Sequence, residues 1–396
     1  MTSRHSDHPD FPSGTMCCID EPLCGWHYRF PSQAGEGRGA KLRAVEGSLE
    51  RVADVISKNV QLGIQLYVSL DGEVLADEAF GHVRPGISLH QRDALPWICC
   101  TKLMGALAMA QQLQAHGLTP HHPVADIVPE YAVGGKREAT LAQLMSHALP
   151  FEPESANRPY SGLEDEEALA QSCAVEMAAP PGTGGWYSAM GSWVVVAEVV
   201  RRLSGRAYAE YVADHVLKPL GMRHTVFGPA PVPRSPALFE RVDGRHVPSE
   251  NVFPGVLAPR LPGTGAWGPA SDLARLVEWL TVPQAGEVLG LSPETVRALT
   301  DTYRTGLPDR NFGDIDLDWG FGMCTDPAWF GVPRGSKVVG HTAYGCGMVV
   351  ADLEERLVVS FLSSSVVPPD SGESRLENRI VREICREVRG RVAVGR

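Results

Sequence analysis

A cysteine and a lysine stand three residues apart in the segment WICCTK at residues 97–102, at the start of the apolar stretch LMGALAMA. This composition favours a helix, and helix positions three apart share a face, so Cys99 and Lys102 would lie together. A helix N-terminus and a neighbouring lysine both favour the thiolate, while burial disfavours the lysine charge. The pattern predicts a nucleophile with its base, although most cysteines of apolar helices are plain core residues.

Composition limits the classes of protein to which the chain can belong. A chain of 396 residues with 43% hydrophobic and 21% charged residues is typical of a soluble globular protein with one large domain or two. A net charge of -11 argues against nucleic acid as a main partner, and no apolar run is long enough to span a membrane. Residues 1–31 lack the apolar core of a signal peptide. We therefore interpret the nine scattered cysteines as reduced thiols of a cytoplasmic protein.

Strand patterns flank a helical middle region. Two strands are expected around an Asp71-Gly72 turn, at 63–69 and 73–80, and three more at 337–341, 345–352 and 356–363. Helices are expected at 40–60, from the WICCTK segment to about 116, and at 141–147, 166–175, 189–203, 208–217, 271–280 and 376–388. Gly117 would end the second helix, and a Ser271-Asp272 cap would begin the seventh.

This order of elements predicts an α+β fold, with an antiparallel sheet assembled from both ends of the chain and an inserted all-α domain. The expected boundaries are an N-terminal extension at 1–36, an α/β sheet domain at 37–118 and 265–396, and a mainly helical domain at 119–264. A cleft between the two domains would hold the site.

Two more stretches complete an ordered set with WICCTK, namely PGTGGWYS at 181–188 and GHTAYG at 340–345. In this order they resemble the serine β-lactamase and penicillin-binding protein superfamily, and above all its class C β-lactamase-like esterases and transacylases. The marks of that family are Ser-x-x-Lys, Tyr-Ser/Ala-Asn and a Lys/His-Thr-Gly strand. LAQLMSHALP at 141–150, KPLGM at 218–222, residues 263–276 and LSPETVRAL at 291–299 extend the resemblance over about 40–389.

The resemblance implies a β-lactamase/transpeptidase-like fold and a role for each matched position. Cys99 takes the nucleophile position, Lys102 deprotonates or orients it, and Tyr187 moves the proton to the leaving group and activates the second acyl acceptor. His341 would bond to the tyrosine or to substrate, and the backbone N–H groups of Cys99 and Tyr344 would form the oxyanion hole. As alternatives, Tyr187 could be a turn aromatic and His341 a structural histidine. The positions expected to bind substrate are Trp186, Ala189, Thr342 and Ala343.

Three departures from the family pattern affect the expected activity. Cysteine replaces serine at Cys99, Ala189 replaces the asparagine that bonds lysine and substrate in the family, and Ala343 replaces glycine. A thioester reacts with amines in preference to water more strongly than an oxyester does. We therefore expect a transacylase of secondary metabolism that acts on a small ester, an amide or an acyl group delivered by a carrier protein. The alternatives are an esterase or amidase of the same fold and an inactive binding protein.

No motif predicts a metal or a cofactor. The letters GxGxxG at 263–268 lack the preceding strand of a dinucleotide site. Cys17, Cys18, Cys24 and His27 match no standard zinc spacing. The expected partners are therefore a small-molecule acyl donor and acceptor.

Overall fold

The structure, a computed structural model, describes residues 45–160, 162–228, 238–249, 257, 261–284, 286–367 and 375–394. The whole of the predicted N-terminal extension at 1–36, with its cysteines and His27, lies outside these residues. In the described part of the chain, no helix is both long enough and apolar enough to cross a membrane.

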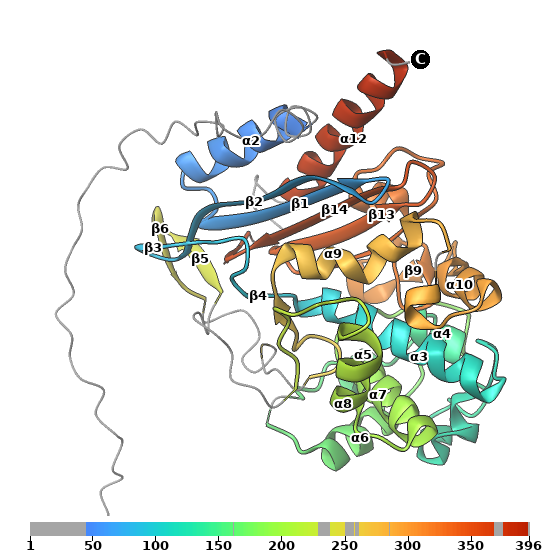
Figure 1. The fold of residues 1–396 in the computed structure, drawn as a ribbon. Coiled ribbons are helices and arrows are strands. Elements are labelled where there is room, and N and C mark those ends of the chain that lie inside the picture. Colours follow the sequence, from blue (N-terminus) through green and yellow to red (C-terminus); the bar gives the residue numbers. More distant parts are fainter. Residues whose placement is uncertain are drawn as a thin grey trace, which may run out of the picture.

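A six-stranded antiparallel sheet organises the chain, with strand order β12-β13-β14-β1-β2-β3. Segments from both ends of the chain lie side by side in it because β1 pairs with β14 from Ile64 opposite Ser363 to Leu70 opposite Leu357. This confirms the predicted α+β class with a sheet built from both termini (Figure 1). The strands of this sheet are β1 (Gly63–Leu70), β2 (Glu73–Arg84), β3 (Ile87–Ser88), β12 (Val338–Ala343), β13 (Gly347–Asp352) and β14 (Leu357–Ser363).

Helices cover both faces of this sheet. On one face α2 (Glu46–Ser57) and α12 (Leu376–Val394) lie side by side, and on the other face α9 (Ala270–Glu278) packs on β1, β13 and β14 (Figure 1). Burial of the apolar stripe of α2 and of both sheet faces supplies the main driving force for this arrangement. The Asp71-Gly72 turn joins β1 to β2 with positive φ at both residues, as an Asp-Gly hairpin requires.

Most of the remaining helices come from the middle of the chain and lie beyond α9 (Figure 1), whereas α11 (Pro327–Phe330) contacts α12. The core of this region forms where α3 and α6 pack on α7. The helices are α3 (Lys102–His116), α4 (Leu141–Met145), α5 (Pro153–Ala156), α6 (Asp165–Cys173), α7 (Gly191–Ser204), α8 (Tyr208–Val212), α10 (Pro293–Thr300) and α11 (Pro327–Phe330). The short strands are β4 (Leu95–Pro96), β5 (Phe239–Val242), β6 (Arg245–Pro248), β7 (Trp267–Gly268), β8 (Thr302–Arg304), β9 (Pro308–Asp309), β10 (Ile315–Asp316), β11 (Trp319–Gly320) and β15 (Ser365–Val366).

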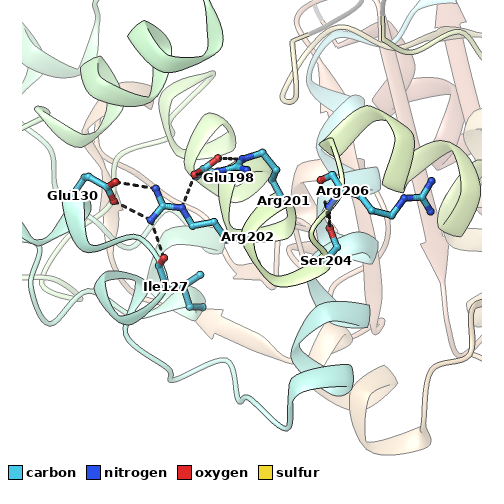
Figure 2. A network of polar contacts seen from close by, with 7 residues as sticks. All are labelled: Ile127, Glu130, Glu198, Arg201, Arg202, Ser204 and Arg206. Carbon is cyan, nitrogen blue, oxygen red and sulfur yellow. Dashed lines mark hydrogen bonds and ion pairs between the residues drawn. The ribbon is translucent and has the colours of Figure 1, made fainter.

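A network of arginines and glutamates fixes the C-terminal end of α7 to the distant segment 127–130 (Figure 2). Arg202 bonds to Glu198 one turn earlier, to Glu130 at 2.9 Å and to the Ile127 carbonyl oxygen at 3.1 Å. These side chains lie near solvent, where each pair contributes at most about 1 kcal/mol. The network orients the helix end and is remote from the chemistry described below.

Three predicted elements need correction. The helix at 271–280 begins at Ala270 after Pro269, and Ser271-Asp272 is not its cap, because Asp272 instead accepts hydrogen bonds from His224 and Thr225. The helix at 208–217 divides into α8 and a π turn at Ala213–Leu217. The described part of the helix at 40–60 is α2, which ends at Ser57. No observation tests the predicted domain boundaries, which stay a prediction.

Candidate active site

Cys99 lies in a 3₁₀ turn, Ile98–Thr101, that leads directly into α3 at Lys102. The sequence predicted one helix through this segment, but in a 3₁₀ turn residues three apart eclipse each other, which brings Cys99 and Lys102 together more directly. Ile98 has φ of +41°, which is strained for a β-branched residue. The turn therefore places Cys99 at a strained corner, where its side chain is 9% exposed and lines the main cavity.

Lys102 is a buried base candidate. Its side chain is 0% exposed, and its Nζ donates a hydrogen bond to the Gly263 carbonyl oxygen at 2.9 Å and interacts electrostatically with the Cys99 thiol. Burial lowers the pKa of Lys102, although the nearby Cys99 thiol acts in the opposite direction. The Gly263 carbonyl occupies the acceptor role that Ala189 cannot fill. This departure from the family pattern therefore leaves the lysine with an acceptor.

Tyr187 approaches the same thiol from the loop before α7. Its hydroxyl interacts electrostatically with the Cys99 thiol, and the Lys102 Nζ lies 5.4 Å from the centre of its ring. Burial, followed by the neighbouring Cys99, raises the pKa of Tyr187 well above its usual value. The protonated phenol is therefore the favoured form, and a phenol can donate a proton to a leaving group.

A frame of polar residues, of which Arg304 and Asp309 are buried, holds the backbone at Tyr187. Asp309 accepts the Tyr187 N–H at 3.1 Å, and Asn311 Nδ2 donates to the Tyr187 carbonyl oxygen at 2.7 Å. Arg304 forms an ion pair with Asp309 at 2.8 Å, and both side chains are 0% exposed. A buried pair of this kind is intolerant of losing one partner. The tyrosine is therefore fixed by groups that lie more than a hundred residues further along the chain.

His147 completes this frame from the segment LAQLMSHALP. Its Nδ1 accepts the Ser188 N–H at 3.2 Å, and its carbonyl oxygen accepts the Trp186 N–H at 3.0 Å and an Arg304 N–H at 3.1 Å. The imidazole centre lies 4.6 Å from that of the Tyr187 ring. Burial, together with the charges of Lys102, Arg304 and His341, lowers the pKa of His147 well below its usual value, so the ring is neutral. His147 thus holds the residues on both sides of Tyr187.

His341 lies on β12 with its side chain 2% exposed. Its ring centre is 6.2 Å from that of Tyr187 and 5.4 Å from that of Trp319. Burial, with the charge of Lys102, lowers the pKa of His341 to about 3. The imidazole is therefore neutral at physiological pH.

A cavity of about 750 Å³ opens beside these groups. Cys99, Tyr187 and His341 line it, as do the predicted substrate-binding residues Trp186, Ala189, Thr342 and Ala343, and also Tyr344. Its other walls include the aromatic side chains of Tyr160, Phe312, Trp319 and Trp329. Trp97 and Trp267 are buried in the core, and their indole N–H groups donate to backbone carbonyl oxygens.

The structure brings the sequence-predicted site residues together around one cavity, but their catalytic roles and the oxyanion hole at Cys99 and Tyr344 stay predictions. Sequence reasoning missed His147, Arg304, Asp309 and Asn311. The segment that carries His147 was recognised as family-like, and its lone histidine was a usable signal. Nothing local marks Arg304 or Asp309, because their partners are distant in sequence.

A sheet built from both chain ends, with a buried Lys–Tyr pair around one nucleophile position, defines the β-lactamase and penicillin-binding protein-like class. The Beta-lactamase family model matches residues 52–382, so the chain belongs to this family.

The chain is also similar to individual proteins of this class. The N-acetylmuramyl-L-alanine amidase of Bacillus subtilis (strain 168) is 21% identical over 386 residues, which cover 83% of this chain and 84% of that protein. Two solved structures share the fold with a TM-score of 0.71, namely EstCE1, described as a hydrolase with promiscuous acyltransferase activity, and a family VIII carboxylesterase. EstCE1 is 17% identical to this chain, and the match covers 88% of this chain and 99% of EstCE1. The carboxylesterase is 19% identical, and the match covers 88% of this chain and 97% of the carboxylesterase.

Proposed function

We propose that this chain is an enzyme that transfers acyl groups through a thioester on Cys99, using a small ester, an amide or a carrier-bound acyl group as donor. The observation that carries the proposal is that one thiol lines a 750 Å³ cavity and interacts electrostatically with both a buried lysine and a buried tyrosine. A buried base beside a nucleophile and a proton donor beside a leaving group are what two-step acyl transfer requires.

In the first step Lys102 Nζ accepts the proton of the Cys99 thiol, and Sγ attacks the acyl carbon to form a C–S bond. The carbonyl π electrons move to oxygen, where the backbone N–H groups of Cys99 and Tyr344 would stabilise the oxyanion. Collapse of this intermediate breaks the bond to the leaving group, which takes the Tyr187 hydroxyl proton. The proton on Lys102 then returns to Tyr187, and the thioester remains.

In the second step an acceptor O–H or N–H attacks the thioester. Its proton passes through Tyr187 and Lys102 to the departing Cys99 sulfur, so the enzyme returns to its starting state. A thioester favours amines over water as the acceptor, which supports transfer over hydrolysis. The neutral state of His341 and the high pKa of Tyr187 are consistent with a site that moves protons without a fixed cation, in which Lys102 is charged only while it holds the proton taken from the thiol.

Hydrolysis is the second candidate function, and a specific observation favours it. The solved structures that share the fold include a carboxylesterase and a hydrolase whose acyltransferase activity is described as promiscuous. In this alternative the same Cys99 thioester forms and water is the acceptor. A third possibility is an inactive binding protein. It would not explain why Lys102 and Tyr187 both interact with Cys99.

Intact-mass spectrometry of the full chain tests the proposal. The protein is incubated with a panel of activated acyl esters and thioesters, with and without added amine, beside C99A, C99S and C173A. We expect an acyl adduct on wild type and C173A, none on C99A, and faster loss of the adduct with amine than with water alone. An adduct cleared equally fast by water supports the hydrolase, and an adduct on C99A contradicts the Cys99 assignment.

A further inference from the structure

Glu377 places a carboxylate in the wall of the cavity that holds Cys99. It lies in the first turn of α12, and its side chain lines the cavity and is partly exposed. Both the Glu377 carboxylate and the Cys99 thiol interact electrostatically with Cys346, a buried residue of the turn between β12 and β13. The carboxylate and the proposed nucleophile therefore belong to the same part of the cavity.

No side chain that the structure describes forms an ion pair with Glu377. Its own backbone N–H interacts with the carboxylate, and Arg375 and Arg379 act on it through their charges. The Arg375 guanidinium carbon instead lies 5.0 Å from the centre of the Trp329 ring, which directs this cation to an aromatic face. The Glu377 carboxylate is therefore available to a ligand in the cavity.

The surroundings of Glu377 favour a cationic ligand. Burial raises the pKa of Glu377 because a carboxylate loses favourable hydration there, although the two arginine charges and its own N–H act in the opposite direction. A partly dehydrated carboxylate without a counter-ion gains a charge-assisted hydrogen bond when a cation binds. An ammonium group suits this role because it offers three donors and no acceptor.

Two arginines also line the cavity, so an anion is the alternative ligand. Arg158 and Arg375 are exposed, and exposed charges are hydrated and screened by salt. Glu377 is more buried than either arginine, and charge interactions are stronger in such surroundings. The cavity walls also include Phe312 and Trp329, whose ring centres lie 5.7 Å apart. Together these features favour a ligand with an apolar body that ends in a cation.

We propose that Glu377 binds a protonated amine of the acyl donor or of the acyl acceptor, so that amine-bearing molecules are the preferred substrates. This inference rests on the proposed Cys99 chemistry and names a substrate class for it. The bound amine keeps its proton and has no free lone pair, so it is not the group that attacks the thioester. A preferred acceptor is therefore a diamine, and a preferred donor carries its amine on the acyl group away from the carbonyl.

Two arms of one experiment separate these two sources of the amine. In the first arm wild-type protein reacts with the phenyl thioesters of para-(aminomethyl)benzoate, para-ethylbenzoate and para-(carboxymethyl)benzoate. In the second arm the acetyl-enzyme, formed with phenyl thioacetate, reacts with putrescine, pentylamine or δ-aminovalerate. The three members of each arm carry an ammonium, a methyl or a carboxylate group at the same place.

We expect at least about a tenfold higher kcat/KM for the ammonium member than for the methyl member in the first arm, in the second arm or in both. Glu377→Gln keeps the size of the side chain but removes its charge, and should reduce each preference to within about twofold. Glu377→Lys should shift the preference toward the carboxylate member. Glu383→Gln is the matched control and should retain the preference, because Glu383 lies on the same helix, pairs with Arg51 and is not among the described residues that line the cavity.

Equal rates for the ammonium and methyl members in both arms of wild type contradict the inference, as does a preference that survives in Glu377→Gln. A wild-type preference for the carboxylate member also contradicts it and assigns the binding to Arg158 or Arg375.

Calorimetry gives a second test that does not depend on the folding of Glu377→Gln or on turnover. Cys99→Ala, which lacks the thiol, should bind para-(aminomethyl)benzamide at least about tenfold more tightly than para-ethylbenzamide, and equal binding overturns the inference. Absence of acetylation of wild type by phenyl thioacetate defeats the proposed function instead, and the calorimetry still decides whether Glu377 binds an amine.

Discussion

The same three residue types, cysteine, lysine and tyrosine, are buried together at two places in this molecule. At the candidate active site they are Cys99, Lys102 and Tyr187. In the helical region they are Tyr131, Lys136 and Cys173, which interact electrostatically with one another, and Lys136 Nζ lies 5.2 Å from the centre of the Tyr131 ring. Chemistry can therefore not be inferred from residue types and burial alone.

The two clusters differ in what surrounds the lysine. Lys136 Nζ donates to the backbone carbonyl oxygens of both Val133 and Val175, so it serves to satisfy the backbone. Among the residues that the structure describes, Lys102 Nζ donates to one carbonyl oxygen, that of Gly263, and interacts electrostatically with the Cys99 thiol. A lysine saturated by carbonyls is a structural donor, and one shared with a nucleophile can move a proton.

They also differ in the space beside them. The cavity that Tyr131 lines has a volume of about 10 Å³, about enough for one water molecule, against about 750 Å³ beside Cys99. In addition, the turn before Cys99 carries a strained Ile98, and polar residues frame Tyr187. The comparison teaches that access, strain and an incompletely bonded base distinguish a reactive site from a buried polar cluster.

The largest expected difference lies between the two thiols. Cys99→Ala should reduce acyl-adduct formation by at least about 10³-fold, because nucleophile removal in covalent enzymes costs that much or more. Cys173→Ala should leave the rate within about twofold, since its thiol lines no large cavity. Stopped-flow measurement of acylation with an activated thioester distinguishes the two. A comparable loss of acylation rate in both variants would contradict the conclusion that only the first cluster is reactive.

Replacing Lys102 or Lys136 by methionine should show which lysine contributes to the acylation rate and which contributes to the free energy of unfolding. Lys102→Met should lower the acylation rate about 10²- to 10⁴-fold, the usual contribution of a positioned base. Lys136→Met should leave the rate nearly unchanged but cost about 1–3 kcal/mol, because the Val133 and Val175 carbonyls lose their partner. Acylation kinetics and urea unfolding on both variants measure these effects. A large rate loss in Lys136→Met would mean that the second cluster takes part in the chemistry.

In the described part of the chain, Tyr131 has no equivalent of the polar frame around Tyr187. Disturbing that frame should lower the catalytic rate less than replacing Cys99 or Lys102 does. His147→Leu removes the acceptor of the Ser188 N–H, and we expect about a 10- to 100-fold lower kcat because a misplacement of about 1 Å at a catalytic group has effects of that size. His147→Asn keeps a side-chain acceptor and should recover part of the rate. If both variants lose the same activity and the same stability, His147 is only a core residue.

Local patterns in the sequence predicted the strands and the proximity of Cys99 and Lys102, whereas Tyr187 and His341 followed from the resemblance to the family. Alternation marks the strands, the Asp71-Gly72 pair marks the hairpin, and the spacing of Cys99 and Lys102 indicates their proximity. The 3₁₀ turn at Ile98 was missed since apolar composition alone cannot distinguish it from an α-helix. The helix at Ala270 began earlier than predicted because Asp272 forms tertiary hydrogen bonds in place of a cap.

What could not be predicted depends on contacts between distant parts of the chain. Arg304 and Asp309 reach Tyr187 only through the folded arrangement of β8 and β9 beside the loop before α7. Likewise the sequence shows that Ala189 lacks the side-chain amide that bonds the lysine in the family. In the structure the Gly263 carbonyl oxygen accepts the hydrogen bond from Lys102. Every residue type carries a backbone carbonyl oxygen, so no sequence motif predicts which one will accept this hydrogen bond.

The smallest predicted effect concerns the pH dependence of stability at the second cluster. Burial lowers the pKa of Lys136 to about 8 from its usual 10.5. Between these values the unfolded chain binds more protons than the folded one, so this lysine makes the free energy of unfolding rise with pH across that window. The raised pKa of Cys173 acts in the opposite direction, so the quantity to measure is the difference between wild type and Lys136→Met from pH 7 to 10.5. That difference should grow with pH in favour of wild type, whereas a flat difference would show that Lys136 titrates as an ordinary exposed lysine and that the second cluster is less buried than the first.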